Sequence, residues 1–142
     1  MPISKTIDEL NEFLQGEYMG IHAYELYIKQ AKDKHVKREL QFIQQDHKLH
    51  AIRIAERIQN LGGMAVDDVG VRGHIGEWML HLKGVPETPK DIIKGALQGE
   101  KMGIAKLKKM TEGDLDGDSL RFVEDLLQED HRHILKLNAL LH

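Results

Sequence analysis

Apolar residues recur along the first part of this chain at steps of three and four positions, the periodicity of an amphipathic α-helix. One such stripe predicts a helix over about residues 7–33, and Thr6 and Glu9 have the capping-box spacing that marks its start. A second stripe predicts a helix over about residues 36–61. A Gly-Gly pair follows directly and would end that helix.

The helical pattern then lapses over residues 62–87, which contain several glycines and Pro86. A short apolar cluster inside this segment predicts one helix around Glu77–Leu82, with Trp78 packed on the rest of the domain. Links of this length are unusual in compact domains, and they often serve as crossovers. We therefore interpret the segment as a crossover between two halves of the fold.

Two further stripes follow the crossover. Thr88 precedes Pro89 as an N-cap residue precedes proline at the first helical position, so a helix is predicted over about residues 89–112. A last helix is predicted over about residues 119–141. Two helical hairpins joined by a long crossover are typical of a ferritin-like four-helix bundle, so we predict a single all-α domain spanning residues 1–142. A plain up-down-up-down bundle is the alternative, although it would not need so long a link.

The sequence also repeats itself. The octapeptide LQGEYMGI at residues 14–21 returns as LQGEKMGI at residues 97–104, a spacing of 83 residues. A second match has a spacing of 84 residues and pairs Gln44, Asp46 and His47 with Gln128, Asp130 and His131. These matches indicate an internal duplication of one helix pair.

Both copies of the octapeptide place a carboxylate where the apolar stripe predicts a core residue. Glu17 lies four residues after Phe13 and four before Ile21, and Glu100 has the equivalent position in the second copy. A buried carboxylate without a partner is costly and tends to take up a proton. Two such carboxylates at duplicated positions therefore predict a shared partner, which is a metal ion or, in the alternative, histidines or arginines of the bundle.

The other two predicted helices carry complementary side chains. His47 and His50 fall in phase with the apolar residues of one helix, and Asp130 and His133 do so on the other. Residues three apart on a helix are neighbours and can act together. Two glutamates with two such pairs are close to the dinuclear carboxylate arrangement of helical bundles. Imidazole and carboxylate ligands together suit iron, manganese or zinc.

Four of the glycines inside the predicted helices lie in the repeated octapeptide, and each costs about 1 kcal/mol relative to alanine. They are Gly16, Gly20, Gly99 and Gly103, again at duplicated positions. Two interpretations stay open at this point. The glycines clear space around a metal site, or they allow close approach of helices within the bundle or at a dimer interface.

Composition and charge exclude several functional classes. The net charge is −3 with basic and acidic residues interleaved, so neither nucleic acid nor an anionic membrane is expected as a partner. The absence of cysteine excludes disulfides, thiolate metal sites and cysteine nucleophiles, and it suits a cytoplasmic protein. No apolar run approaches the ~18 residues that a membrane span needs.

With these residues in view, the chain resembles the bacterioferritin branch of the ferritin-like proteins. The resemblance rests on LNEFLQGEYMGIHAYELY around Glu17, HAIRIAERIQNLGG from His50, LQGEKMGIAKL around Glu100 and EDLLQEDHRHI around His133. In that family, the glutamates and histidines of these motifs bind two irons, and the site oxidises Fe(II) with oxygen or peroxide.

Carried over residue by residue, the resemblance implies that Glu17 and Glu100 are terminal metal ligands. It further implies that His50 and His133 are the two histidine ligands. Tyr24 matches a tyrosine near the site, where it could supply an electron or a hydrogen bond during catalysis.

The chain departs from the family pattern at several positions. Asp130 stands where the family has one bridging glutamate, and His47 stands where the other belongs. Asp46 could supply the missing carboxylate, so the choice between His47 and Asp46 as the ligand stays open. Lys48 replaces the methionine that binds haem in bacterioferritins, so no haem is expected.

We therefore expect a metal-binding protein with one or two irons per chain, or manganese or zinc in their place. Metal ions and an oxidant would be its partners, in Fe(II) oxidation, iron sequestration or peroxide detoxification. The sequence stops directly after the fourth helix, which favours a homodimer over a large cage. The alternative is a stress-related helical bundle with a degenerate metal site, acting as a structural or interaction protein. A DNA-protecting miniature ferritin is disfavoured because the chain has no basic tail.

Overall fold

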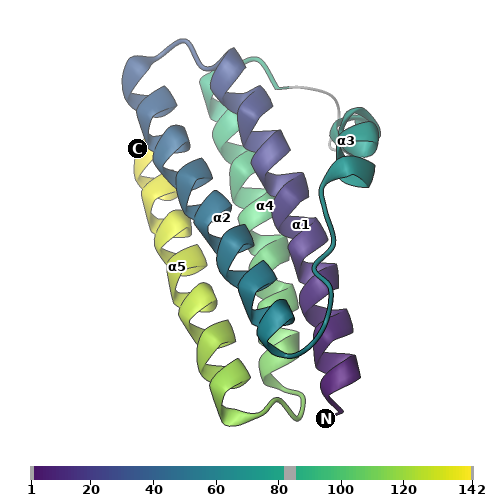
Figure 1. Cartoon of the computed structure of the whole chain (residues 1–142). Coiled ribbons are helices and arrows are strands. Elements are labelled where there is room, and N and C mark those ends of the chain that lie inside the picture. Colours follow the sequence, from purple (N-terminus) through teal and green to yellow (C-terminus); the bar gives the residue numbers. More distant parts are fainter. Residues whose placement is uncertain (1, 82–85, 142) are drawn as a thin grey trace.

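The computed structural model describes residues 2–81 and 86–141, and within these ranges the chain is helical with no strand (Figure 1). Four long helices form a bundle, and a shorter one lies outside it beside the first. They are α1 (Ile3–Gln30), α2 (Lys34–Asn60), α3 (Val69–His81), α4 (Pro89–Thr111) and α5 (Gly117–Leu141). The prediction of an all-helical bundle is thereby confirmed.

The order of the helices along the chain explains why a long link is needed. Helix α1 packs chiefly against α2, and α4 packs chiefly against α5. After α2, the chain runs back along α1 and through α3 before α4 begins, so that α2 and α4 point in the same direction (Figure 1). Contacts of α1 with α4 and of α2 with α5 close the bundle.

The helix ends are set largely by capping residues. The Asp33 side chain accepts hydrogen bonds from the backbone N–H groups of His35 and Val36 and so caps α2. Thr88 caps α4 as predicted, because its hydroxyl accepts from the Asp91 N–H at 3.1 Å.

Two helices differ from the sequence-based expectation. The N-cap of α1 is Pro2, whose carbonyl accepts from the N–H groups of the first turn, so Thr6 is buried inside the helix instead of capping it. Helix α3 begins at Val69, well before the predicted start at Glu77. The predicted packing of Trp78, like the end of that helix at Leu82, lies outside the described residues.

Side chains of α1 hold the crossover in place. The amide of Asn11 donates to the carbonyl of Met64 at 3.0 Å and accepts from the N–H of Val66 at 2.9 Å. The hydroxyl of Tyr18 donates to the Val66 carbonyl at 3.3 Å. These bonds satisfy backbone groups of a link that has no regular structure at this point.

The bundle core consists of two apolar clusters with a polar layer between them. One cluster surrounds Tyr27, Leu40 and Leu137, and the other surrounds Leu14 and Ile54. On each long helix the buried ionisable residues lie between the residues that belong to the two clusters. Two layers of apolar packing therefore seal a charged layer from both ends of the bundle. Over the described ranges, no helix combines the length and apolar character needed to cross a membrane.

The helix-interior glycines give a first prediction. A Cβ atom added at Gly16 or Gly99 would meet no atom within 4 Å beyond its own helix. Since alanine favours a helix over glycine, Gly16→Ala and Gly99→Ala should each raise the free energy of unfolding by about 0.5–1 kcal/mol. Urea denaturation followed by circular dichroism measures the change.

A third glycine is the control. Gly62 has a φ of 89°, a backbone conformation that alanine adopts only with strain. Gly62→Ala should therefore lower the free energy of unfolding by about 1–2 kcal/mol. Loss of stability in Gly16→Ala or Gly99→Ala would show that space at these positions is already occupied.

Candidate metal centre

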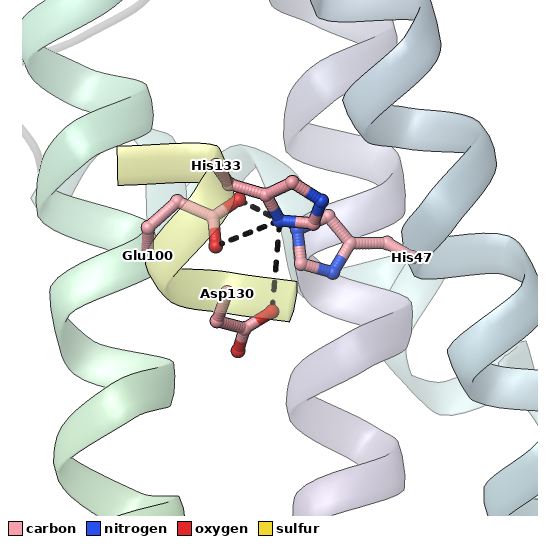
Figure 2. Close-up of side chains that lie close together, drawn as sticks. All are labelled: His47, Glu100, Asp130 and His133. Atoms are coloured by element: carbon pink, nitrogen blue, oxygen red, sulfur yellow. Dashed lines mark hydrogen bonds and ion pairs between the residues drawn. The ribbon is translucent and has the colours of Figure 1, made fainter. Parts of the chain in front are cut away.

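The polar layer contains all six residues that the sequence offers as metal ligands. Each has at most 6% of its surface exposed. Helix α1 supplies Glu17, α2 supplies His47 and His50, α4 supplies Glu100, and α5 supplies Asp130 and His133. Figure 2 shows four of these side chains, from α2, α4 and α5, pointing toward one another. The structure thus brings the predicted residues together.

His47 lies between the two glutamates. Its Nδ1 is 2.8 Å from Glu17 Oε2, and its Nε2 is 2.6 Å from Glu100 Oε1. Because carboxylates only accept, both ring nitrogens donate, and the ring is an imidazolium. Burial lowers the pKa of His47, but the carboxylates of Glu17 and Glu100 outweigh this and hold the pKa well above its usual value. His47, and not Asp46, is therefore the residue of this pair that faces the interior.

Glu100 receives three donors. The Tyr24 hydroxyl donates to its Oε1 at 2.7 Å, His47 donates to the same oxygen, and His133 Nδ1 lies 3.4 Å from Oε2. Burial would raise the pKa of this carboxyl, yet the charges and hydrogen bonds of His47 and His133 hold the pKa far below its ordinary value. Glu100 is accordingly a fully ionised carboxylate in the interior of the bundle.

The two remaining histidines are oriented by carboxylates at the edge of the site. His133 Nε2 lies 2.9 Å from Asp46 Oδ2, and His50 Nε2 contacts Glu129. Each histidine therefore pairs with a carboxylate from the other half of the duplicated chain. With Nε2 held in this way, Nδ1 of both rings is directed to the interior, as in carboxylate–histidine–metal arrangements.

Glu129 was missed by the sequence-based search. The spacing of 83 residues that relates Glu17 to Glu100 also relates Asp46 to Glu129, and so would have identified it. The sequence match with a spacing of 84 residues aligns His47, which is buried, with His131, which is exposed. The two positions are therefore not equivalent in the structure. A chance similarity of short polar stretches therefore obscured the true register.

Two buried atoms in this layer have no hydrogen-bond partner among the described residues. They are His50 Nδ1 and Asp130 Oδ1, which lie 3.9 Å apart. Glu17 Oε2 is also 3.9 Å from His50 Nδ1. Such separations are too long for hydrogen bonds, but they lie within the span of up to about 4.4 Å that two ligands of one metal ion can have at about 2.0–2.2 Å each.

The donor set as a whole fits a metal ion. Candidate ligand atoms that lie within 4.8 Å of one another form two groups that share His47. One group contains His47, Glu100, Asp130 and His133, and the other contains Glu17, His47 and His50. Nitrogen and oxygen donors of these types suit iron, manganese or zinc.

A pocket of about 980 Å³ leads from the surface between α1 and α4 to this layer. Its walls include the four glycines of the repeated octapeptides and crossover residues such as Val66, and its inner end is formed by residues that include Glu17, Glu100 and Asp130. Side chains at three of these glycines would contact nothing beyond their own helix, and only a Cβ at Gly103 would come within 4 Å of another atom, at 3.5 Å from Asp130 Oδ2. Of the two interpretations, the structure favours the one in which the glycines leave space beside the site.

Tyr24 lies where the resemblance implied a tyrosine, beside the polar layer. Besides its hydrogen bond to Glu100, its ring is 5.5 Å from the His47 ring, centroid to centroid. Burial, followed by the charge of Glu100, raises the pKa of Tyr24 well above its usual value. The hydroxyl therefore stays protonated and acts as a donor, while the electron-transfer role stays a prediction.

Comparison with known proteins places the chain in a family. Residues 5–113 match the family described as a domain of unknown function, DUF2383. The chain belongs to the DUF2383 family. No curated protein matches this DUF2383 chain.

Three solved structures resemble the DUF2383 protein over nearly its whole length. A protein of Bacteroides fragilis, described as a dodecameric thioferritin and bacterioferritin-related, has a TM-score of 0.81 at 20% identity and covers 99% of this chain and 86% of its own. A ferritin-like diiron-carboxylate protein of Bacillus anthracis has a TM-score of 0.76 at 23% identity, with full coverage of both chains. A DPS protein of Vibrio cholerae O1, from the same broad superfamily, has a TM-score of 0.75 at 19% identity and covers 99% and 91%. The fold is ferritin-like.

The raised histidine pKa values predict how the stability of the metal-free protein depends on pH. The pKa of His133 is raised to about 9, because contacts with Asp130 and Glu100 outweigh burial, and that of His47 is also raised. A histidine whose pKa is higher in the folded protein stabilises the folded state when it is protonated. This stabilisation is fully present below the pKa of histidine in the unfolded chain, about 6.5, and it is lost as pH rises through the pKa of the folded protein. The urea midpoint, measured with a chelator present, should therefore be lower at pH 9 than at pH 6.

Below pH 5 we expect the stability of the metal-free protein to fall as the pH falls. The lowered pKa of Glu100 gives stability that is lost as pH falls below the unfolded value of about 4.3. Stability should thus be greatest near pH 5–6.5. His131→Ala, at an exposed position of α5, should leave the profile unchanged. A flat profile between pH 6 and pH 9 would contradict the imidazolium at His47.

Tyr24 and Tyr27 form a matched pair for the hydrogen bond to Glu100. Both are buried on α1, but among the described residues only the Tyr24 hydroxyl has a hydrogen-bond partner. Tyr24→Phe should lower the free energy of unfolding of metal-free protein by about 1.5–3 kcal/mol, since it removes a bond to a buried charge. Tyr27→Phe should cost less, and equal losses measured by urea denaturation would refute the assignment.

Proposed function

We propose that this protein binds iron in the buried layer of the bundle and oxidises Fe(II), in iron sequestration or peroxide detoxification. The observation that carries the proposal is the convergence of six ligand-type side chains from four helices around two buried atoms without partners. Burial of such atoms is costly unless a further partner binds them. A metal ion supplies that partner for nitrogen and oxygen together.

The charges of the layer support a cation as the ligand. Three carboxylates, on Glu17, Glu100 and Asp130, face the interior, while the His47 imidazolium donates to the two glutamates. Asp130 has its pKa raised, first by burial and then by the neighbouring glutamates despite a contact with His133. A divalent cation beside Asp130 would reverse this effect and stabilise the ionised form.

The pocket between α1 and α4 supports a path for the substrates. Its glycine-lined walls connect the surface with Glu17 and Glu100, so ferrous iron and a small oxidant could enter from the same side. Each Fe(II) gives up one electron, and two Fe(II) with two protons reduce one hydrogen peroxide to two water molecules. The chain would bind the iron, orient Glu100 through the hydrogen bond that the Tyr24 hydroxyl donates, and exclude bulk water through the two apolar clusters.

The neighbours are consistent with this choice of metal, since two of them are described as ferritin-like diiron-carboxylate proteins. Manganese or zinc would suit the same donors, but zinc would give no redox chemistry. A cytoplasmic homodimer belongs to the proposal, and light scattering after gel filtration tests the dimer.

One observation favours a second candidate function. His47 already neutralises Glu17 and Glu100 in part, through hydrogen bonds at 2.8 and 2.6 Å. Such a contact gives the layer internal stability without a metal. The protein would then be a stress-related structural or interaction protein with a degenerate site.

Metal binding to the metal-free protein separates the two functions. We expect anaerobic Fe(II) to bind and to raise the thermal midpoint, because a ligand at 100 times its dissociation constant stabilises the folded state by about 2.7 kcal/mol. The double variant Glu17→Ala, Glu100→Ala should show neither effect. Oxygen or peroxide added to the iron-loaded protein should then yield Fe(III). Binding by the natural chain no greater than that of the double variant would leave only the structural bundle.

A further inference from the structure

The duplicated chain provides two halves of a metal centre that are equivalent in sequence. We call Glu17 and His50 the first half and Glu100 and His133 the second half, since a spacing of 83 residues relates them. Asp130 lies close to both histidines, with Oδ1 at 3.9 Å from His50 Nδ1 and 3.6 Å from His133 Nδ1. The structure nevertheless distinguishes the two halves.

In the second half every donor and acceptor has a protein partner. Glu100 accepts from Tyr24 and His47 at Oε1 and faces His133 at Oε2. His133 is occupied at both nitrogens, by Asp46 at 2.9 Å and by Glu100 at 3.4 Å. A metal ion placed here would have to replace contacts that already satisfy these groups.

In the first half Glu17 Oε2 accepts from His47, but one histidine nitrogen has no such contact. His50 is held at Nε2 by Glu129, but its Nδ1 has no hydrogen-bond partner among the described residues. Asp130 Oδ1, which also lacks one, and Glu17 Oε2 are each 3.9 Å from this nitrogen. Two ligand-type atoms without partners among the described residues, on α2 and α5, thus lie near each other, with an oxygen of Glu17 close to one of them.

His47 lies between the two halves. Its ring stands between the two glutamates, where a carboxylate that bridges two metal ions would be required. The ring instead forms a hydrogen bond with each glutamate. A second metal ion at this place would have to displace both hydrogen bonds and would find no shared carboxylate.

We propose that the centre binds a single divalent metal ion through Glu17, His50 and Asp130, and that His47 occupies the place of a second ion. This inference rests on the proposed function, because it assumes that the layer binds a metal. One imidazole with two carboxylates favours Fe(II) or Mn(II) over softer ions. If the ion is iron, the centre would then supply one electron at a time, whereas a dinuclear centre with two Fe(II) supplies two.

The duplication supplies a matched pair of variants. Mn(II) is the probe, with its stoichiometry measured by equilibrium dialysis of the full chain and its environment by electron paramagnetic resonance. The natural chain should bind one Mn(II). His50→Ala should weaken that binding by more than about 100-fold, since it removes a ligand, whereas His133→Ala should weaken it by less than about tenfold. Circular dichroism verifies that both variants fold.

His47→Glu tests the part played by the His47 ring. The carboxylate would bridge the two halves, so the stoichiometry should rise from one to two Mn(II) per chain. The resonance spectrum should change from that of an isolated ion to that of an exchange-coupled pair. If this variant fails to fold, the comparison of His50→Ala with His133→Ala still decides the assignment.

The outcomes separate this inference from the function on which it rests. Two Mn(II) in the natural chain, with one lost in each histidine variant, would overturn the single-ion centre and leave metal binding intact. One Mn(II) that is lost in His133→Ala and kept in His50→Ala would overturn the choice of half. Absence of binding to the natural chain, by Mn(II) and Fe(II) alike, would overturn the proposed function itself.

Discussion

The contact of His47 with Glu17 and Glu100 is the interaction on which the rest of this bundle depends. Two carboxylates lie in the middle of a hydrophobic core, where an unpaired charge is costly enough to unfold a small domain. The imidazolium bridges them and so makes the charged layer tolerable without any bound ligand. The helices can then pack around the layer, and each long helix contributes apolar residues to both of the clusters that enclose it.

The same contact divides a duplicated site into unequal halves. Duplication alone would give two equivalent sets of ligands, and the outer carboxylates Asp46 and Glu129 do follow that symmetry. His47 breaks it, because Asp130 is the residue at the equivalent position of the second copy. Glu100 and His133 have protein partners, whereas His50 Nδ1 and Asp130 Oδ1 have none among the described residues. Hydrogen bonds within the protein therefore stabilise Glu100 and His133, whereas metal binding requires atoms such as His50 Nδ1 that have no protein partner.

The crossover and the helix-interior glycines complete this arrangement. Glycine weakens a helix, yet these positions recur in both copies and line the pocket that reaches the polar layer. Side chains of α1 hold the crossover along one wall of that pocket through Asn11 and Tyr18. A long link that the topology requires thus also limits access to the site. This accounts for a buried charged layer that is closed at both ends by apolar packing and reached by a pocket from the side.

The sequence by itself determined the periodic features of this protein. Helical periodicity located the four long helices, and the phase of Glu17, His50 and their duplicated partners within the apolar stripes placed ligand-type residues in one buried layer. These features depend on residues three and four positions apart, so a single sequence records them. Only the tertiary structure decided the choice of His47 over Asp46, the role of Glu129 and the unpaired state of His50 Nδ1. These depend on distances of a few ångströms between helices that lie far apart in the chain, and helix periodicity carries no information about such distances.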